Sequence, residues 1–212
     1  MTELDAVFDQ QGSLAQVIAG YQPRKAQIEM AQSIASAIES QDNLIAEAGT
    51  GTGKTFAYLI PAILSRKKVI VSTGTKNLQD QLFNKDLPLI RSALPKTPFR
   101  ASLLKGRANY LCTYRLDQAL NTAFGYSQED AKALSLINEW GRKTRHGDIS
   151  EIADVHEGDP VWYHATSTAD NCLGQNCPKI GDCFLVKARK QAQEADLVVV
   201  NHHLLCADWS IR

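Results

Sequence analysis

The sequence has no net charge, no long apolar run and no internal repeat. Lysine plus arginine and aspartate plus glutamate each number 23 in 212 residues. Overall charge therefore cannot hold a polyanion, and any nucleic-acid contact must come from local patches. No apolar stretch approaches the roughly 20 residues that span a bilayer, and the N-terminus MTELDAVFDQ lacks the pattern of a signal peptide. We therefore expect a soluble, cytoplasmic protein with no membrane partner.

Cysteine is present in a number that does not suit a disulfide framework. The chain has 5 cysteines, and an odd number in a reducing compartment cannot pair completely. Cys172, Cys177 and Cys183 lie within one short stretch. This clustering indicates a metal ion or an iron–sulfur cluster.

The first half of the chain alternates between helix-like and strand-like patterns. Apolar residues recur at helical spacing, or form short continuous runs typical of strands buried on both faces. The expected elements are a helix at 24–39, a buried strand at 43–47, a helix at 56–64, a strand at 68–73 and a helix from 77 to about 88. This order is typical of a parallel α/β sheet.

The pattern then breaks and later resumes. A short strand at 100–104 precedes an irregular region with helical pieces at 114–120 and 130–140, and ADLVVVN at 195–201 again predicts a buried strand. The predicted fold class is α/β: an incomplete RecA-like parallel sheet with a P-loop, interrupted by a mostly helical and irregular four-cysteine insertion. The predicted domains are 1–104, the first part of the sheet domain, 105–190, the insertion, and 191–212, the return to the sheet.

One segment has the pattern of a phosphate-binding loop, or P-loop. It reads Ala48-Gly49-Thr50-Gly51-Thr52-Gly53-Lys54-Thr55, follows a predicted strand and opens a predicted helix. Backbone N–H groups of such a loop surround the phosphates of ATP. We predict Lys54 and Thr55 as the catalytic residues, with Lys54 at the β- and γ-phosphates and Thr55 on Mg²⁺. The alternative is a glycine-rich turn without a ligand.

Alanine at the first position, in place of glycine, is typical of many P-loop helicases. Upstream of the loop, Tyr21 and Gln27 resemble the adenine-reading Q motif of superfamily 2 helicases. A glutamine amide pairs with both the donor and the acceptor edge of adenine. Glutamines are also common at helix starts, so a purely structural role is the alternative.

A polar segment comes after the strand predicted at 68–73. Ligands bind at the carboxyl edge of such sheets, and hydroxyl groups, a backbone turn and a lysine there are suited to the phosphates of a DNA strand. The residues concerned are Thr73, Gly74, Thr75 and Lys76. A polar connection with a capping threonine is the alternative.

Four cysteines of the insertion form a candidate ligand set. Cys112 stands alone, and Cys172, Cys177 and Cys183 come later with irregular spacing. Structural zinc sites mostly use closely spaced pairs, so this spacing suits a [4Fe–4S] cluster better. Unbound buried thiols are the alternative, and Cys206 is expected to be an ordinary buried thiol.

Five segments together resemble the iron–sulfur superfamily 2 DNA helicases of the XPD/DinG-like group. They are AGTGTGKT, VSTGTKNLQDQL, LLKGRANYLC, DNCLGQNCPKIGDCFLVKARK and ADLVVVNHHLL, in that order. The resemblance implies ATP-dependent unwinding of single-stranded or forked DNA in the 5′-to-3′ direction, in DNA repair or replication. It also implies a [4Fe–4S] cluster on Cys112, Cys172, Cys177 and Cys183, and an adenine contact for Gln27.

The chain departs from the family after its last predicted strand. In the family an acidic DEAH box comes next, holding Mg²⁺ and activating water, and a second motor domain supplies an arginine. Neither is found before Arg212. We therefore expect an N-terminal portion of a helicase that binds nucleotide weakly and does not turn it over. His202 and His203 are interpreted as a polar pair at a strand end.

Basic residues of the insertion are candidates for DNA phosphate contacts. They are Lys105, Arg107, Arg142, Lys143, Arg145, Lys187, Arg189 and Lys190. Residues 101–190 hold 11 basic and 11 acidic residues, so a solvated mixed-charge surface is the alternative. Two other functions stay open: an inactive iron–sulfur module that binds nucleotide and single-stranded DNA, and an unrelated P-loop ATPase with a zinc insertion.

Overall fold

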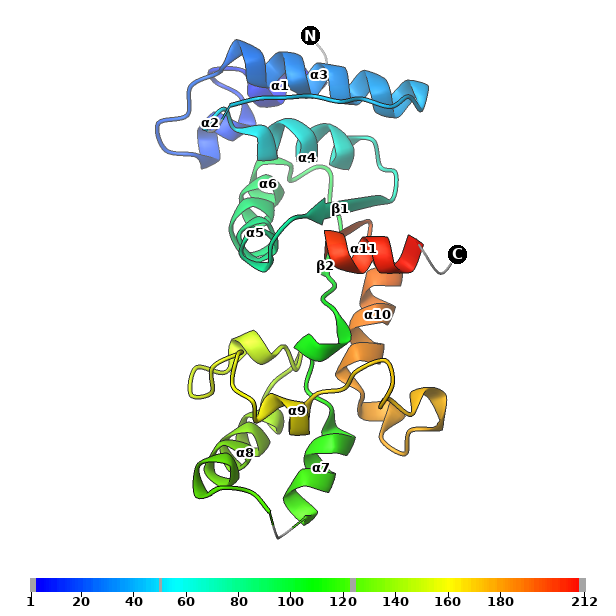
Figure 1. Cartoon of the computed structure of the whole chain (residues 1–212). Helices are drawn as coiled ribbons and strands as arrows, with labels where there is room; N and C mark the ends of the chain where they lie inside the picture. The colour runs from blue at the N-terminus through cyan, green and yellow to red at the C-terminus, as the bar shows by residue number, and fades with distance from the viewer. Residues whose placement is uncertain (1–2, 50, 123–124, 210–212) are drawn as a thin grey trace. The chain divides into compact units, whose positions relative to one another are not determined.

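The computed structural model describes residues 3–49, 51–122 and 125–209. It divides the chain into two compact units (Figure 1). Unit 1 is Met1–Leu103 with Glu194–Arg212, and unit 2 is Leu104–Gln193. No helix in the described part of the chain has both the length and the apolarity to cross a bilayer.

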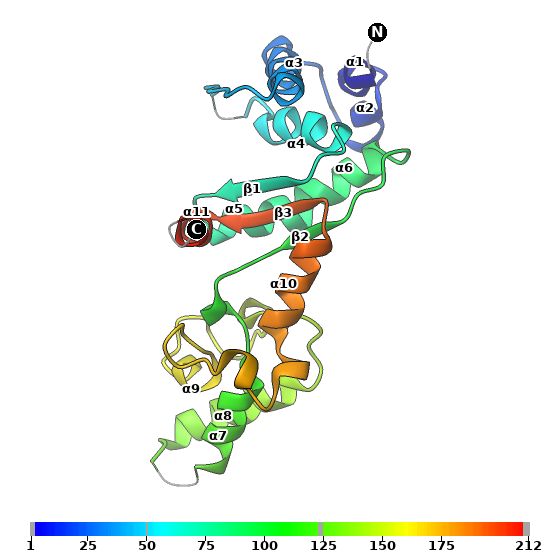
Figure 2. The same cartoon turned by 90° about the vertical axis from the view of Figure 1, so that its right-hand side faces the viewer.

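Unit 1 contains a parallel sheet of three strands in the order β1-β3-β2. The strands are β1 (Val69–Thr73), β2 (Ala101–Leu103) and β3 (Leu197–Asn201), side by side in Figure 2. In register, Val71 pairs with Val199 and Thr73 with Asn201, while Leu103 pairs with Val199 from the other side. β3 is the central strand and its first four residues are buried, as expected for a parallel strand covered on both faces.

Unit 1 contains helices at the three predicted places, and others, near the N-terminus and after β3, that were not predicted. They are α1 (Glu3–Phe8), α2 (Ser13–Val17), α3 (Lys25–Ser40), α4 (Lys54–Leu64), α5 (Lys76–Gln81), α6 (Leu87–Ala93) and α11 (His202–Trp209). A π-helical segment, Leu82–Asp86, joins α5 to α6. The mixed α/β class with a small parallel sheet is therefore confirmed.

The buried strand predicted at 43–47 is wrong. The segment is extended but belongs to no strand, Ile45 is 99% exposed and Leu44 is 43% exposed. Leu44 and Ala46 line a groove together with side chains of α3 and with Tyr58. A strand needs a hydrogen-bonded neighbour, and in the described residues β1 pairs only with β3. Apolar composition alone therefore did not bring this segment into the sheet.

The core of unit 1 lies between the sheet and the N-terminal helices. Fully buried side chains from α1, α2, α4, α6 and β3 pack together; they include Phe8, Leu14, Leu59, Ile60, Leu87, Ile90 and Val199. α3 packs along α4, the most extensive helix–helix contact of the unit. This packing fixes the start of α4, where the P-loop ends.

Unit 2 is built from short helices and single 3₁₀ turns. The helices are α7 (Thr113–Asn121), α8 (Gln128–Gly141), α9 (Trp162–Ala165) and α10 (Phe184–Glu194), and the turns are Arg107–Asn109, Ile149–Glu151, Gly174–Asn176 and Ile180–Asp182. Its own core gathers Leu116, Ile137, Val161, Trp162 and Phe184. Trp140 meets Trp162 edge-on, with ring centroids 6.3 Å apart.

Candidate functional site

The P-loop leads from the extended segment 43–47 into α4. Two of its glycines adopt a backbone conformation that favours glycine. Gly51 and Gly53 have φ of 76° and 79°, the left-handed region that glycine adopts without steric cost. Gly53 is the N-cap of α4. Thr50, predicted as a nucleotide contact, lies outside the described residues.

Lys54 occupies the mouth of the loop. Its Nζ donates to the carbonyl oxygens of Ala48 and Gly49, each at 2.6 Å. The Thr52 hydroxyl also donates to the Gly49 carbonyl, at 2.9 Å. The lysine ammonium therefore stands where the loop curves back on itself, the position from which it can meet the phosphates of a nucleotide.

Two residues at the start of α3 hold the same loop from outside. Arg24 donates from Nη1 to the carbonyl of Gly51. Gln27 is 4% exposed and donates from Nε2 to the Gly53 carbonyl at 2.9 Å. A Cβ atom on Gly53 would collide with that amide nitrogen, so glycine is needed here for space as well as for φ. Arg24 is not among the predicted site residues, because an arginine before a helix carries no specific signal.

The amide of Gln27, which is predicted to contact adenine, is hydrogen-bonded within the protein. The Tyr21 hydroxyl donates to Gln27 Oε1 at 3.4 Å and to the Phe8 carbonyl at 3.2 Å, and burial raises the pKa of Tyr21. Both ends of the Gln27 amide thus have partners in the protein. Tyr21 and Gln27 form a support for the P-loop, and their contact with a base stays a prediction.

Thr55, the predicted Mg²⁺ residue, lies on the first turn of α4. Tyr58, one turn further on, has its pKa raised chiefly by burial; a hydrogen bond from Thr55 lowers it, and the nearby Asp86 raises it. Burial also raises the pKa of Asp86 itself, against the opposing effect of Lys85. The P-loop helix is thus linked through Tyr58 to the π-helical segment.

The carboxyl ends of β1 and β3 meet at one edge of the sheet. Thr73, the last residue of β1, is buried, and its hydroxyl donates to the Thr75 carbonyl at 3.2 Å. Thr75 caps α5 by accepting from the Leu78 N–H at 3.2 Å. Lys76 opens α5, and His202, which comes directly after β3, meets Ser72 at 2.7 Å.

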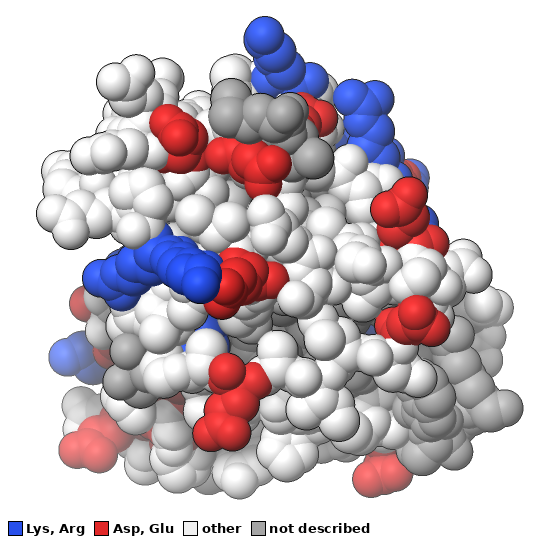
Figure 3. All heavy atoms as spheres, turned by 90° about the horizontal axis from the view of Figure 1, so that it is seen from above, with Lys and Arg blue, Asp and Glu red and all other residues white. Residues whose placement is uncertain are grey.

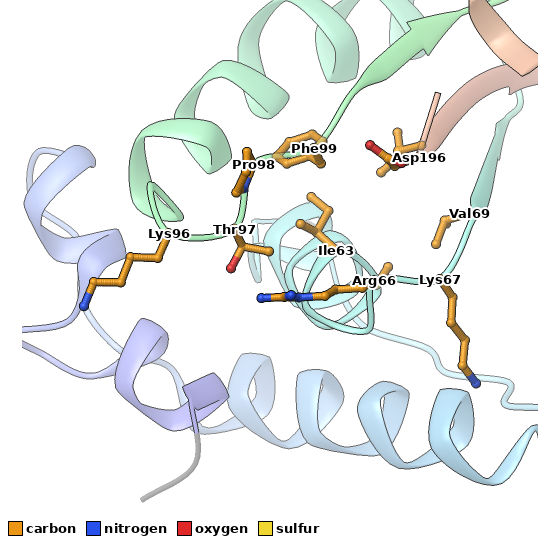
Figure 4. Close-up of a pocket in the computed structure, with 11 residues that line it drawn as sticks. Ile63, Arg66, Lys67, Val69, Lys96, Thr97, Pro98, Phe99 and Asp196 are labelled. Atoms are coloured by element: carbon orange, nitrogen blue, oxygen red, sulfur yellow. The ribbon is translucent and has the colours of Figure 1, made fainter. Parts of the chain in front are cut away.

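The opposite edge of the sheet holds a pocket of about 260 Å³ with an apolar wall and a basic rim (Figure 4). Ile63 and Phe99 form the wall, and Arg66 reaches below Thr97. Asp196 is already engaged, because Arg100 donates to it from the backbone at 2.7 Å and pairs with it from the side chain at 3.8 Å. The pocket therefore shows no feature that selects a ligand.

In unit 2 the predicted ligand thiols are half-buried. The pKa of Cys112 is raised first by burial, lowered by N–H groups of Arg115 and Tyr114, and raised again by the neighbouring Cys183 and Cys177. Cys183 and Cys177 are thus each within electrostatic reach of Cys112. Within the described ranges, however, no three His, Cys, Asp or Glu side chains are arranged to hold a metal ion. The four thiols are the type of ligand that an iron–sulfur cluster takes, but in this structure they are not arranged around a common centre.

Cys206 differs from the expectation of a buried thiol, because its side chain is exposed. It belongs to α11, whose described residues carry no buried side chain.

The side chain of Lys105 is buried, whereas a contact with DNA requires an exposed side chain. Its side chain is 3% exposed and pairs with Asp148 at 2.7 Å, and Nζ donates to Ser150 Oγ at 3.2 Å. The buried ammonium is satisfied within unit 2, so the structure assigns it a structural role in place of the predicted phosphate contact. Arg107, in the adjacent 3₁₀ turn, is half-buried.

Charges of both signs lie on the face shown in Figure 3. Lys and Arg stand beside Asp and Glu there, with uncharged residues between them.

Known proteins match this chain in sequence. The family model described as DEAD/DEAH box helicase matches residues 25–102. The ATP-dependent DNA helicase YoaA of Haemophilus influenzae is 49% identical over 97% of this chain and 32% of its own length. The ATP-dependent helicase DinG of Mycobacterium tuberculosis is 37% identical over 92% of the chain and 32% of its own length.

The 3′-5′ exonuclease DinG of Bacillus subtilis is 34% identical over 92% of the chain and 21% of its own length. The chain thus spans a third or less of the length of these relatives. The match extends across both units, whereas the family model covers residues of unit 1 alone. By these matches, residues 25–102 resemble the DEAD/DEAH box helicases, and the chain is homologous to part of the helicases YoaA and DinG.

Proposed function

We propose that this chain supplies the ATP-binding and single-strand-binding part of an ATP-dependent DNA helicase, which works in the cytoplasm in DNA repair or replication with 5′-to-3′ polarity. The observation that carries the proposal is the P-loop, in which Lys54 lies at the loop mouth and Arg24 and Gln27 brace the loop backbone. In this proposal Lys54 neutralises the β- and γ-phosphates and Thr55 binds Mg²⁺.

Hydrolysis needs groups that these 212 residues do not contain. The sequence after β3 has no acidic DEAH box, and in phosphoryl transfer an acidic residue and an arginine supply the water positioning and the charge stabilisation. We therefore expect the chain to bind ATP without turning it over. An inactive module that binds nucleotide and single-stranded DNA is the alternative function.

A titration with a fluorescent ATP analogue and Mg²⁺ tests the nucleotide site. Lys54→Ala is expected to weaken binding at least tenfold, because a charged contact to phosphate is lost. Lys96→Ala, an exposed lysine at the opposite edge of the sheet, is the matched control and should bind like the wild type. Equal affinities for all three proteins would refute the P-loop assignment.

For unit 2, the proposal is a [4Fe–4S] cluster on Cys112, Cys172, Cys177 and Cys183. The support is the kind of donor and the closeness of Cys183 and Cys177 to Cys112. Bound there, the cluster would tie the start of α7 to the loop between α9 and α10 through iron–thiolate bonds. A single zinc ion on the same thiols is the alternative.

Anaerobic reconstitution with iron and sulfide tests the cluster. We expect a brown protein with about four irons per chain, and loss of most of the iron in each of the four single Cys→Ser variants. Cys206→Ser is the matched control, since this exposed cysteine lies outside unit 2. A colourless protein that takes up one zinc ion would refute the cluster.

A further inference from the structure

A hydrogen bond joins the ends of β1 and β3 through two side chains far apart in sequence. Ser72 Oγ lies 2.7 Å from His202 Nδ1, across 130 positions of sequence. The strands are in parallel register here, with Thr73 opposite Asn201. Asn201 Oδ1 accepts from the Leu204 N–H at 2.7 Å, which fixes the turn from β3 into α11. The Ser72–His202 contact and the hydrogen bond between Asn201 and Leu204 therefore both restrain the chain around His202.

The contact with Ser72 determines where the other ring nitrogen lies. A Cβ atom placed on Gly74 would be 3.8 Å from both Nε2 and Cδ2 of His202. The ring thus lies over the connection between β1 and α5, and His202 is exposed. When the Ser72 hydroxyl donates to Nδ1, the imidazole proton is on Nε2. The residue then presents an N–H donor beside Gly74.

The connection from Thr73 to Lys76 contains the Thr75 hydroxyl and the Lys76 ammonium as side-chain donors. The Thr73 hydroxyl is used inside the connection, on the Thr75 carbonyl. Thr75 Oγ1 serves as the cap of α5. A phosphodiester passing this edge of the sheet would meet Lys76 on one side and the His202 imidazole on the other.

We propose that His202 is a phosphate-contacting residue for single-stranded DNA, donating from Nε2 to a phosphodiester oxygen, with Ser72 as the positioning residue that orients its ring. The proposal rests on the single-strand binding proposed above. It adds a contact from β3 and α11 to those predicted on the β1 side. His203, next in sequence and also exposed, has no such link to the β1 connection among the contacts of the described residues.

Fluorescence anisotropy with a labelled oligothymidine tests this on the 212-residue chain. The measurement is made at pH 8, and the proposal gives His202 one hydrogen bond to a phosphodiester oxygen. His202→Ala is expected to weaken binding about fivefold, and Ser72→Ala about twofold to threefold, since the ring stays but loses its orientation. His203→Ala is the matched control and should bind like the wild type.

Salt dependence separates this contact from a charged one. Losing one lysine–phosphate contact on single-stranded DNA lowers the slope of log K against log salt by about 0.7. We expect that change for Lys76→Ala and an unchanged slope for His202→Ala. The role of Ser72 has its own readout, because Ser72→Ala should shift the His202 ring-nitrogen NMR signals even without DNA.

The outcomes distinguish the inference from the function on which it rests. If Lys76→Ala weakens binding but His202→Ala matches His203→Ala, the inference is overturned and single-strand binding stands. If the wild type does not bind the oligonucleotide, both the His202 contact and the proposed single-strand binding are refuted. If His202→Ala unfolds at a lower temperature, His202→Gln is measured in its place. Retention of affinity within about threefold by this amide donor supports a hydrogen bond, and loss as large as in the alanine variant at unchanged stability counts against it.

Discussion

Unit 1 and unit 2 are stabilised by different kinds of contact. In unit 1 the three parallel strands repeat the same backbone pairing from residue to residue, and aliphatic side chains cover the sheet. In unit 2 single contacts join segments far apart in sequence. Lys105 meets Asp148, the Leu111 N–H donates to the Gly147 carbonyl at 2.8 Å, and the Cys112 N–H donates to the Ala165 carbonyl at 2.7 Å.

This difference predicts how each unit responds to substitution. A regular sheet spreads its stability over many equivalent contacts, so one truncated side chain costs only its own burial and the cavity it leaves. Unit 2 has an apolar core of its own but also a buried ion pair, and removing one partner of such a pair costs more, because the other is left buried without compensation. We therefore expect the most damaging single substitutions in unit 2.

The largest effect is expected for Lys105→Met. This change leaves the Asp148 carboxylate against a buried, uncharged neighbour and is expected to cost about 3–5 kcal/mol of the free energy of unfolding. Urea unfolding followed by tryptophan fluorescence measures it, because Trp140 and Trp162 both belong to unit 2.

Two further variants show whether burial is the cause. Lys179→Met removes another lysine of unit 2, whose pair with Asp117 at 2.8 Å has side chains 46% and 44% exposed, and we expect little change in the unfolding midpoint. The double change Lys105→Met with Asp148→Leu should recover much of the lost stability, since no buried charge remains. Equal losses for Lys105→Met and Lys179→Met would contradict the distinction between the units.

Gly147→Ala is expected to be the next most damaging. Gly147 has φ of 65°, and a Cβ atom there would overlap the ring of Phe184. Backbone strain and overpacking together are expected to cost about 3 kcal/mol. Gly174→Ala is the control, because Gly174 has φ of 57° but no atom near its Cβ position, so only the strain of about 1 kcal/mol remains. Indistinguishable losses for the two variants would show that Phe184 moves aside.

In unit 1, Val199→Ala is expected to have a smaller effect. Val199 is fully buried in the central strand β3, and removing its two methyl groups should cost about 2 kcal/mol from lost burial and the cavity left behind. Circular dichroism during urea unfolding measures the change. A loss larger than that of Lys105→Met would reverse the order that the comparison predicts.

Most of unit 1 is predictable from the sequence because its regular helices and strands are marked by local sequence patterns. Hydrophobic periodicity identified α3 and α4, the run ADLVVVN identified β3, and the glycine pattern identified the P-loop before α4. These are local signals, carried by neighbouring residues of the element itself. They predicted the mixed α/β class, whereas the family was indicated by the resemblance of five segments to known helicases.

The features that the sequence could not predict depend on partners far along the chain. Nothing local marks Lys105 as the partner of Asp148, so an exposed phosphate contact was a reasonable interpretation of a lysine in a polar stretch. In the same way, Gln27 has the position of an adenine contact, but its amide meets Gly53, and His202 meets Ser72. Side-chain pairing across long sequence separations results from tertiary packing, which hydrophobic pattern does not encode.

The smallest effect is expected for Ile45→Ala, the substitution that most directly probes the limit of sequence pattern. Ile45 and Val199 lie in runs of similar apolar character, but the first is 99% exposed and the second fully buried. Because Ile45 has almost no burial to lose, its truncation should change the free energy of unfolding by less than about 0.5 kcal/mol. A loss near that of Val199→Ala would mean that 43–47 is packed as a strand in solution. An unchanged stability would show that an apolar run becomes buried where its backbone pairs with a neighbouring strand. Val199 lies in such a paired strand, and Ile45 does not.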